Sequence, residues 1–119
     1  MASTAPAPTL TMILKVTVDP SNVPAFLEAL RPVYDGVSST PECTFVQLLQ
    51  SPSSPGEFKI VETWNATMEW LQSVQLKKPY YAILAEKVTP LYTKPQEIEV
   101  WEGVQGKEWV SVNKDFYFS

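Results

Sequence analysis

The segment KIVETWNATMEWLQ, Lys59 to Gln72, joins a strand pattern directly to a helix pattern. Apolar and β-branched residues dominate its first part, and a period of two places Ile60, Glu62 and Trp64 on one face of a strand. Asn65 then predicts the N-cap of a short helix whose apolar residues recur at helical spacing. The segment therefore predicts a strand that ends beside a helix, with Trp64 facing a small apolar pocket at the junction.

The hydrophobic pattern around this segment predicts the rest of the fold. Strands are expected at residues 10–18, 43–50, 57–64 and 97–102. Helices are expected after Asp19-Pro20, after Asn65 and from Pro79 onward. The order is β-α-β-β-α-β with the second helix broken in two. It predicts an α+β fold of the ferredoxin-like type, an antiparallel sheet with helices on one face.

The first helix allows two more detailed predictions. Ser21 is a better N-cap than Asp19, because it puts Pro24 in the first turn, where a missing N–H costs nothing. Pro32 removes one hydrogen bond inside the helix. We therefore expect a kink or an early end near Arg31.

The chain divides into a tail, one domain and an extension. Its 119 residues, 45% of them hydrophobic, suit a single globular domain. Residues 1–9 are small and Pro-rich and are expected to form a disordered tail, whereas residues 10–105 form the domain. Residues 106–119 are too apolar for a free tail, since they include Trp109 and Phe116. This extension is expected to add an edge strand or to reach a partner chain.

Composition excludes several classes of function. Nine Lys and Arg residues stand against 13 Asp and Glu residues with no basic cluster, so we expect no nucleic-acid or membrane partner. The chain has no histidine and a single cysteine, Cys43, which excludes histidine metal sites, histidine-ligated haem and Ser-His or Cys-His dyads. No signal-peptide core or membrane span is recognisable, so a cytoplasmic location is expected.

Apolar residues on both faces of two predicted strands indicate a partner. In strand 10–18, Leu14 points to one side and Ile13 to the other, and Ile60 and Val61 repeat this in strand 57–64. Helices can cover only one of these faces. We therefore expect the second face to be buried in a homodimer.

Several motifs carry a resemblance to a known family. PECTFVQLLQSP and FKIVETWNATMEWLQSVQLKKPYYAIL, within roughly Leu10 to Glu102, resemble the antibiotic biosynthesis monooxygenase (ABM) family. This family belongs to the dimeric α/β-barrel superfamily, so the resemblance implies that two copies build a barrel. It also implies quinone-forming oxidation of a polycyclic phenol or anthrone by dioxygen with no metal, flavin or other cofactor. Many members carry histidine where this chain has Tyr80, and haem-degrading relatives need a histidine that is absent here.

Glu62 and Trp64 are the leading candidates for a site. Glu62 shares a strand face with apolar residues, and a carboxylate in such surroundings has a raised pKa that suits a general base. The alternatives are a salt bridge to Lys15, Arg31 or Lys59, or exposure at the barrel rim. Trp64 can wall a substrate pocket or simply fill the core.

Tyrosines supply the second set of candidates. Tyr80 and Tyr81 are adjacent on a helix and point about 100° apart, so only one can face the interior squarely. Tyr80 fits the apolar stripe better and is predicted to be catalytic, with a core tyrosine bonded to backbone as the alternative. Further substrate-binding candidates are Tyr34, Gln47, Phe26, Tyr81 and Leu84.

Three functions agree with these observations. The first is a cofactor-independent monooxygenase of an aromatic, polyketide-type molecule, which the family resemblance implies. The second is a non-oxidative cyclase, decarboxylase or isomerase on the same scaffold. The third is a dimer that binds a small molecule without turnover.

Overall fold

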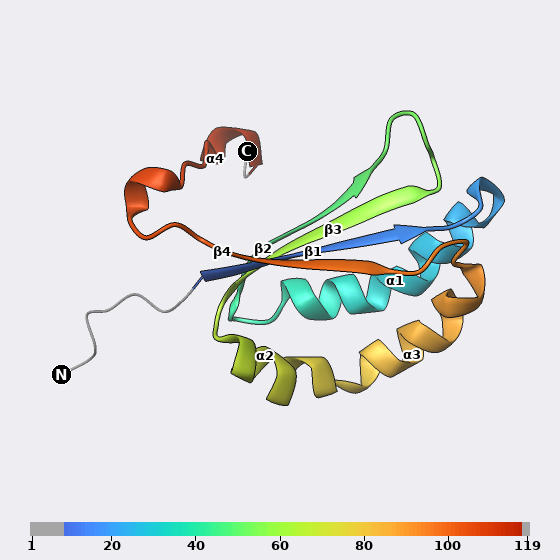
Figure 1. The fold of residues 1–119 in the computed structure, drawn as a ribbon, viewed down its shortest axis with the longest axis horizontal. Coiled ribbons are helices and arrows are strands. Elements are labelled where there is room, and N and C mark those ends of the chain that lie inside the picture. Colours follow the sequence, from blue (N-terminus) through green and yellow to red (C-terminus); the bar gives the residue numbers. More distant parts are fainter. Residues whose placement is uncertain (1–8, 118–119) are drawn as a thin grey trace.

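The computed structural model describes residues 9–117 as a four-stranded antiparallel sheet, with the helices that precede its last strand against one face (Figure 1). The strands are β1 (Thr9–Thr17), β2 (Cys43–Gln50), β3 (Glu57–Asn65) and β4 (Glu97–Glu102). The helices are α1 (Val23–Ser38), α2 (Met68–Ser73), α3 (Pro79–Val88) and α4 (Lys114–Tyr117), with single turns η1 (Pro20–Asn22), η2 (Gln75–Lys77), η3 (Thr89–Leu91) and η4 (Lys107–Trp109). The predicted order is confirmed, including the break in the second helix. Of the predicted tail, only Thr9 lies in the described part of the chain.

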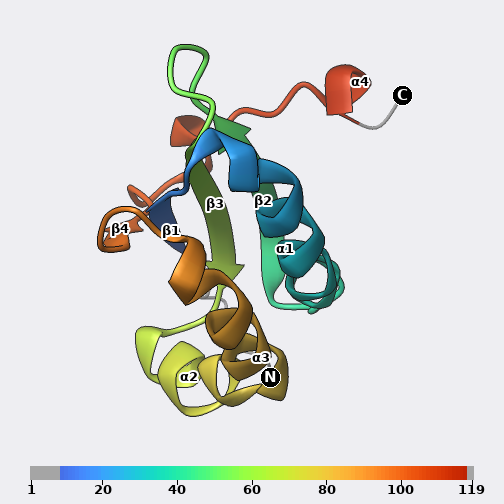
Figure 2. The ribbon, with the colours of Figure 1, turned by 90° about the vertical axis from the view of Figure 1, so that its right-hand side faces the viewer.

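The sheet has the strand order β2-β3-β1-β4, which is the predicted ferredoxin-like topology. β1 lies between β3 and β4, so that Leu14 stands opposite both Ile60 and Ile98. β2 and β4 form the two edges, and the sheet does not close into a barrel within this chain (Figure 2). A barrel would require a second copy.

Strand alternation builds the core on the helix-covered face. Two buried clusters form there, one around Phe26 and Phe58, whose ring centroids are 4.9 Å apart, and one around Trp64 and Leu71. Trp64 has no exposed surface at all. Tertiary packing of these alternate residues is therefore what holds the helices against the sheet.

The predicted Ser21 cap is wrong. Asp19 starts the turn instead, because its Oδ1 accepts a hydrogen bond from Ser21 N at 2.9 Å. Pro20 follows with a backbone angle that suits the first position of a turn, so η1 forms before α1 begins at Val23.

The predicted Asn65 cap is also wrong. Asn65 remains in β3, and its N–H donates to the Glu42 carbonyl at 2.8 Å. Thr67 caps α2, because its Oγ1 accepts from Trp70 N at 3.1 Å. The strand therefore continues one residue further than the local pattern indicated.

The expected early end of the first helix near Arg31 is wrong as well, since α1 continues through Pro32 to Ser38. Pro32 lies on the exposed side of α1, and Leu30 and Val33 beside it are buried. Packing of the buried stripe outweighs the one hydrogen bond that proline removes. The prediction that Pro79 begins a helix is confirmed by α3.

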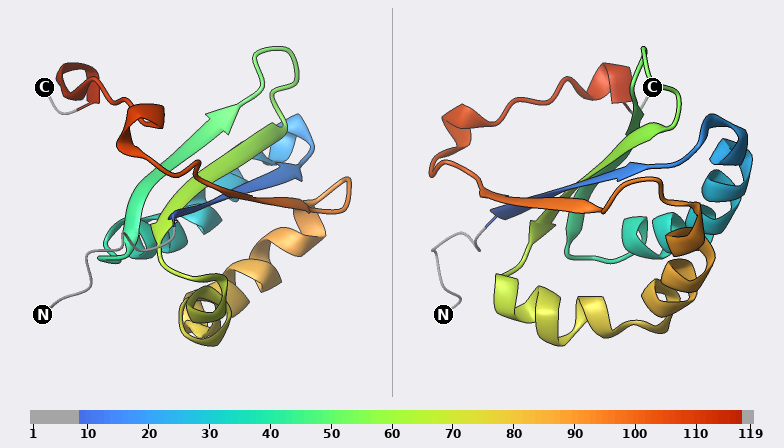
Figure 3. Two further views of the ribbon diagram at one scale, coloured as in Figure 1. Left: turned by 60° about the vertical axis from the view of Figure 1, so that its left-hand side comes forward. Right: turned by 45° about the vertical axis from the view of Figure 1, so that its right-hand side comes forward.

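The described part of the extension, residues 106–117, follows β4 and lies on the side of the sheet opposite α1, α2 and α3 (Figure 3). Within the described residues it forms η4 and α4 and adds no strand to the sheet. Trp109 and Phe116 are 70% and 83% exposed. Tyr117 lies on Phe45 of β2, with ring centroids 6.5 Å apart. The extension is therefore a largely apolar segment with much of its surface uncovered.

Candidate active site

A cavity of about 260 Å³ lies between the helix-covered face of the sheet and helices α1 and α3. Its lining is mostly apolar and includes Leu14, Phe26, Leu30, Val33, Ile60 and Leu84. Its polar residues are Glu62, Tyr34, Tyr81, Thr89, Tyr92 and Gln96. Ligand pockets usually measure about 300–1,000 Å³, so this one suits a compact and largely apolar molecule.

Glu62 is the one carboxylate in this lining. It faces the cavity because it alternates with Ile60 along β3, and its cross-strand neighbours are Met12 and Val46. Burial raises the pKa of Glu62, and a hydrogen bond of 3.1 Å that Trp64 Nε1 donates to Oε1 partly offsets the rise. The net effect is a raised pKa, so the ionised form of Glu62 is a stronger base than an exposed glutamate.

The salt-bridge alternative for Glu62 finds no support. Lys15 pairs with Glu57 at 3.2 Å, and Arg31 pairs with Asp35 at 2.5 Å. Within residues 9–117, Glu62 takes part in no ion pair. Within the described residues, no Lys or Arg side chain therefore pairs with the charge of Glu62.

Tyr81, rather than Tyr80, lines the cavity. Both hydroxyl oxygens accept a hydrogen bond of 2.8 Å from Nε2 of Gln75, which is fully buried in η2. The two rings meet edge to face with centroids 4.7 Å apart. Burial and the nearby Glu62 raise the pKa of Tyr81, so its hydroxyl stays protonated and can donate a hydrogen bond at neutral pH.

Tyr80 lies behind Tyr81, against α1. A Cβ atom added at Gly36 would stand 2.5 Å from Cε2 of Tyr80, so only glycine lets this ring pack on the helix backbone. Gly36 is thus required by close approach rather than by an unusual backbone angle. Tyr80 fills the space between α1 and α3 instead of reaching the cavity.

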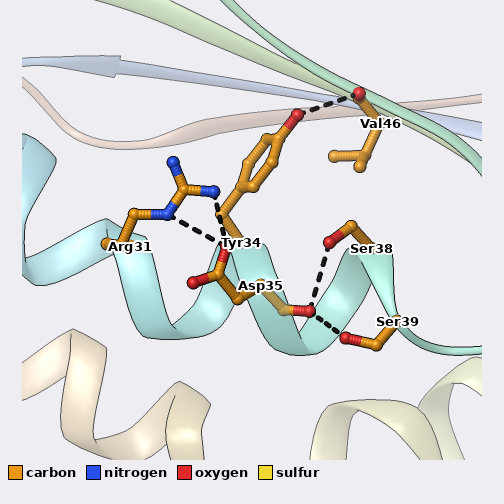
Figure 4. A network of polar contacts seen from close by, with 6 residues as sticks. All are labelled: Arg31, Tyr34, Asp35, Ser38, Ser39 and Val46. Carbon is orange, nitrogen blue, oxygen red and sulfur yellow. Dashed lines mark hydrogen bonds and ion pairs between the residues drawn. The ribbon is translucent and has the colours of Figure 1, made fainter. Parts of the chain in front are cut away.

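Tyr34 ties the cavity wall to the sheet (Figure 4). Its hydroxyl donates to the Val46 carbonyl of β2 at 3.2 Å. The Arg31 guanidinium lies 5.0 Å from the centre of its ring, held by the ion pair to Asp35. Because its hydroxyl is used by the backbone, Tyr34 offers a bound molecule mainly its ring.

Comparison with known proteins identifies the family. The profile of the family "Antibiotic biosynthesis monooxygenase" matches residues 9–78. This chain belongs to that ABM family. A protein of Pestalotiopsis microspora named "Putative monooxygenase GME11364" is 34% identical over 112 residues, which cover 94% of this chain and 93% of that protein.

Solved structures of proteins that carry the family's name share the ABM fold of this chain. One from Caulobacter crescentus has a TM-score of 0.74 at 20% identity and covers 84% of this chain and 93% of its own. One from Nitrosomonas europaea has a TM-score of 0.74 at 18% identity, and the match covers 87% of this chain and 97% of the Nitrosomonas chain. The ferredoxin-like architecture is therefore that of the family.

The ABM fold places the predicted site residues in three different settings. Phe26, Leu84, Tyr34, Tyr81 and Glu62 line the cavity. Trp64 and Tyr80 lie in the core behind it, and each is linked by a hydrogen bond to a polar residue of the site region. Gln47, predicted to bind substrate, is exposed on the opposite sheet face, because its register partner is Val61.

Sequence reasoning missed the polar residues supplied by the connecting segments. Gln75 belongs to η2, Tyr92 follows η3, and Gln96 precedes β4. A signal existed only for Gln75, which follows the buried Leu71 by four residues and so continues the buried side of that segment. Tyr92 and Gln96 lie outside any periodic pattern.

No group of three or more His, Cys, Asp or Glu side chains within residues 9–117 could hold a metal ion. No helix in that range is long and apolar enough to cross a membrane.

Proposed function

We propose that this ABM family member is a cofactor-independent monooxygenase that oxidises a small phenol or anthrone of polyketide type in the cavity. The observation that carries the proposal is a half-buried carboxylate, Glu62, which forms no ion pair within residues 9–117 and lies with the Tyr81 hydroxyl on an otherwise apolar wall. An apolar ring system fits such a lining, and its one polar end would meet these two groups.

Glu62 is the proposed general base. In its ionised form it removes the proton from the phenol oxygen or from the acidic CH₂ of an anthrone. The Tyr81 hydroxyl donates a hydrogen bond to the oxygen on which negative charge develops. Positive side chains are not needed, because the delocalised ring system shares the charge.

The oxidation balances without an outside reductant. The deprotonated substrate gives an electron to dioxygen, dioxygen adds to the ring carbon, and loss of water leaves a carbonyl group. One oxygen atom stays in the product, and the other leaves as water with two hydrogens of the substrate. The substrate supplies all four electrons, and protonated Glu62 returns its proton to the departing oxygen.

Oxygen consumption tests this proposal directly. Purified protein treated with chelator and free of flavin is expected to consume one dioxygen for each anthrone converted, measured with an oxygen electrode and by product analysis. Conversion that continues without oxygen would instead indicate the cyclase, decarboxylase or isomerase. Binding of the anthrone with no conversion in either condition would indicate a protein that only binds its ligand.

We also propose that the working form is a homodimer that joins the open faces of two sheets. Phe45 and Leu49 are each 40% exposed on that face, and Trp101 is 59% exposed. Residues 106–117 lie on the same side and would contact the partner copy. Burying these exposed apolar side chains against a second copy would remove them from water, which favours association. Sedimentation that finds a monomer at micromolar concentration would contradict this.

A further inference from the structure

Gln75 is a polar side chain in a place where packing alone would favour an apolar one. It has no exposed surface, and Leu71 and Trp64 of the same buried region are apolar. Burying an amide is costly unless its hydrogen bonds are made. Gln75 makes two through Nε2, yet its Oε1 has no partner among the described residues. An incompletely satisfied amide in the core indicates a role other than stability.

The hydrogen bonds of Gln75 connect the cavity wall to the helix packing behind it. Its two N–H groups reach Tyr80 and Tyr81 at 2.8 Å each. Tyr80 is held against α1 at Gly36, so it cannot move freely. Gln75 therefore links the Tyr81 hydroxyl, which borders the cavity, to Tyr80, whose ring packs against α1.

The direction of these bonds determines what Tyr81 can do. A hydroxyl oxygen that accepts from Gln75 keeps its own hydrogen for another acceptor. That hydrogen cannot point back at the donor, so it points either toward the neighbouring Tyr80 hydroxyl or toward an oxygen atom bound in the cavity. Accepting one hydrogen bond also polarises the O–H group and strengthens the bond that it donates.

We propose that Gln75 is a positioning residue that holds the Tyr81 hydroxyl so that it donates a hydrogen bond to the oxygen of a bound phenol. The identity of the ligand rests on the proposed function. Gln75 itself touches no ligand, because it does not line the cavity. It acts through Tyr81 and restricts that hydroxyl to one orientation.

The experiment measures binding of 2-naphthol without oxygen, and naphthalene serves as the matched ligand that lacks the hydroxyl. Gln75→Met keeps the length of the side chain and removes the amide. It is expected to weaken the binding of 2-naphthol about fivefold, which is the usual contribution of one hydrogen bond. Naphthalene binding is expected to stay unchanged. Tyr81→Phe is expected to weaken 2-naphthol at least as much, and the double variant no further than Tyr81→Phe alone.

Three outcomes would overturn the proposal. The first is an equal loss of 2-naphthol and naphthalene binding in Gln75→Met, which would mean that Gln75 only maintains the cavity. The second is a double variant in which the two losses multiply, since Gln75 would then act independently of Tyr81. The third is wild-type protein that binds 2-naphthol no more tightly than naphthalene.

A replacement variant and a separate oxygen measurement complete the experiment. If Gln75→Met does not fold, Gln75→Asn replaces it, because that amide is one carbon shorter and cannot reach both tyrosines. Oxygen consumption is measured separately with the anthrone. Wild-type protein that binds 2-naphthol as expected but consumes no oxygen contradicts the proposed function and leaves the role of Gln75 intact.

Discussion

Two Glu-x-Trp pairs, Glu62 with Trp64 on β3 and Glu99 with Trp101 on β4, have the same local geometry in opposite surroundings. In each pair the tryptophan Nε1 donates to the glutamate two residues earlier, at 3.1 Å and 2.8 Å. Residues two apart share a strand face, so the sequence spacing alone accounts for both bonds. Trp64 is fully buried beneath the helices, whereas Trp101 is 59% exposed on the open face.

The difference shows which properties come from the motif and which from the fold. The hydrogen bond is local, because both pairs have it. The raised pKa of Glu62 comes first from burial, which the helices above it create. The cavity that Glu62 lines lies on the helix-covered face. The raised pKa of Glu62 is therefore a product of tertiary structure acting on an ordinary strand pattern.

The largest expected effect is on turnover. Glu62→Gln keeps the shape and removes the proposed base, so turnover of an anthrone should fall by about 10²–10⁴-fold. The matched variant Glu99→Gln changes the same residue type on the open face and should retain wild-type turnover. Oxygen uptake at saturating substrate measures both. Equal rates for Glu62→Gln and wild type would remove Glu62 from the mechanism.

The next comparison concerns stability. Trp64→Ala should lower the free energy of unfolding by about 3–5 kcal/mol, because it leaves a cavity in a fully packed core. Trp101→Ala should act through association instead, so its melting temperature should approach that of wild type as protein concentration rises. Urea and thermal unfolding at several concentrations measure both variants. A loss for Trp64→Ala below ~1 kcal/mol would contradict the assignment of this residue to the core.

The strand pattern was enough to predict the face on which Glu62 lies, because alternation is fixed by backbone geometry. The helix pattern could not predict whether Tyr80 or Tyr81 reaches the cavity. Adjacent helix positions differ only by a rotation about the helix axis, and close packing at Gly36 decides which ring turns toward α1. Pro32 was misjudged for a similar reason, because local propensity yields to buried neighbours. Gln75 depends on a turn that periodicity does not describe.

Deletion of the extension is expected to have a smaller effect, and it tests the open face of the sheet. Deletion of residues 106–119 should raise the dimer dissociation constant about tenfold, because it removes exposed aromatic residues such as Trp109. A full-length variant with Trp109→Ser and Phe116→Ser keeps the backbone of the extension and removes two of its aromatic side chains. It therefore separates the effect of these side chains from the effect of shortening the chain. Analytical ultracentrifugation measures the constant. A deletion that changes neither the oligomeric state nor the melting temperature would mean that the extension serves no interface.

The smallest expected effect is the dependence of stability on pH that Glu62 creates. Its folded pKa is raised, so the native state keeps a proton that the unfolded chain has already released. The contribution of Glu62 to stability is therefore highest below the ordinary pKa of a carboxyl group. It decreases as pH rises toward the folded value and is constant above that value. Glu62→Gln, which does not titrate, should gain stability relative to wild type across this window.

Urea unfolding at a series of pH values tests the sign of this linkage. The difference between Glu62→Gln and wild type should grow with pH through the window and then level off. Trp64→Phe provides the opposing variant, because it removes the hydrogen bond that lowers the pKa of Glu62. It should extend the window to higher pH. Parallel stability curves for wild type and Glu62→Gln would show that the fold does not raise this pKa, and the contrast between the two Glu-x-Trp pairs would then be one of exposure alone.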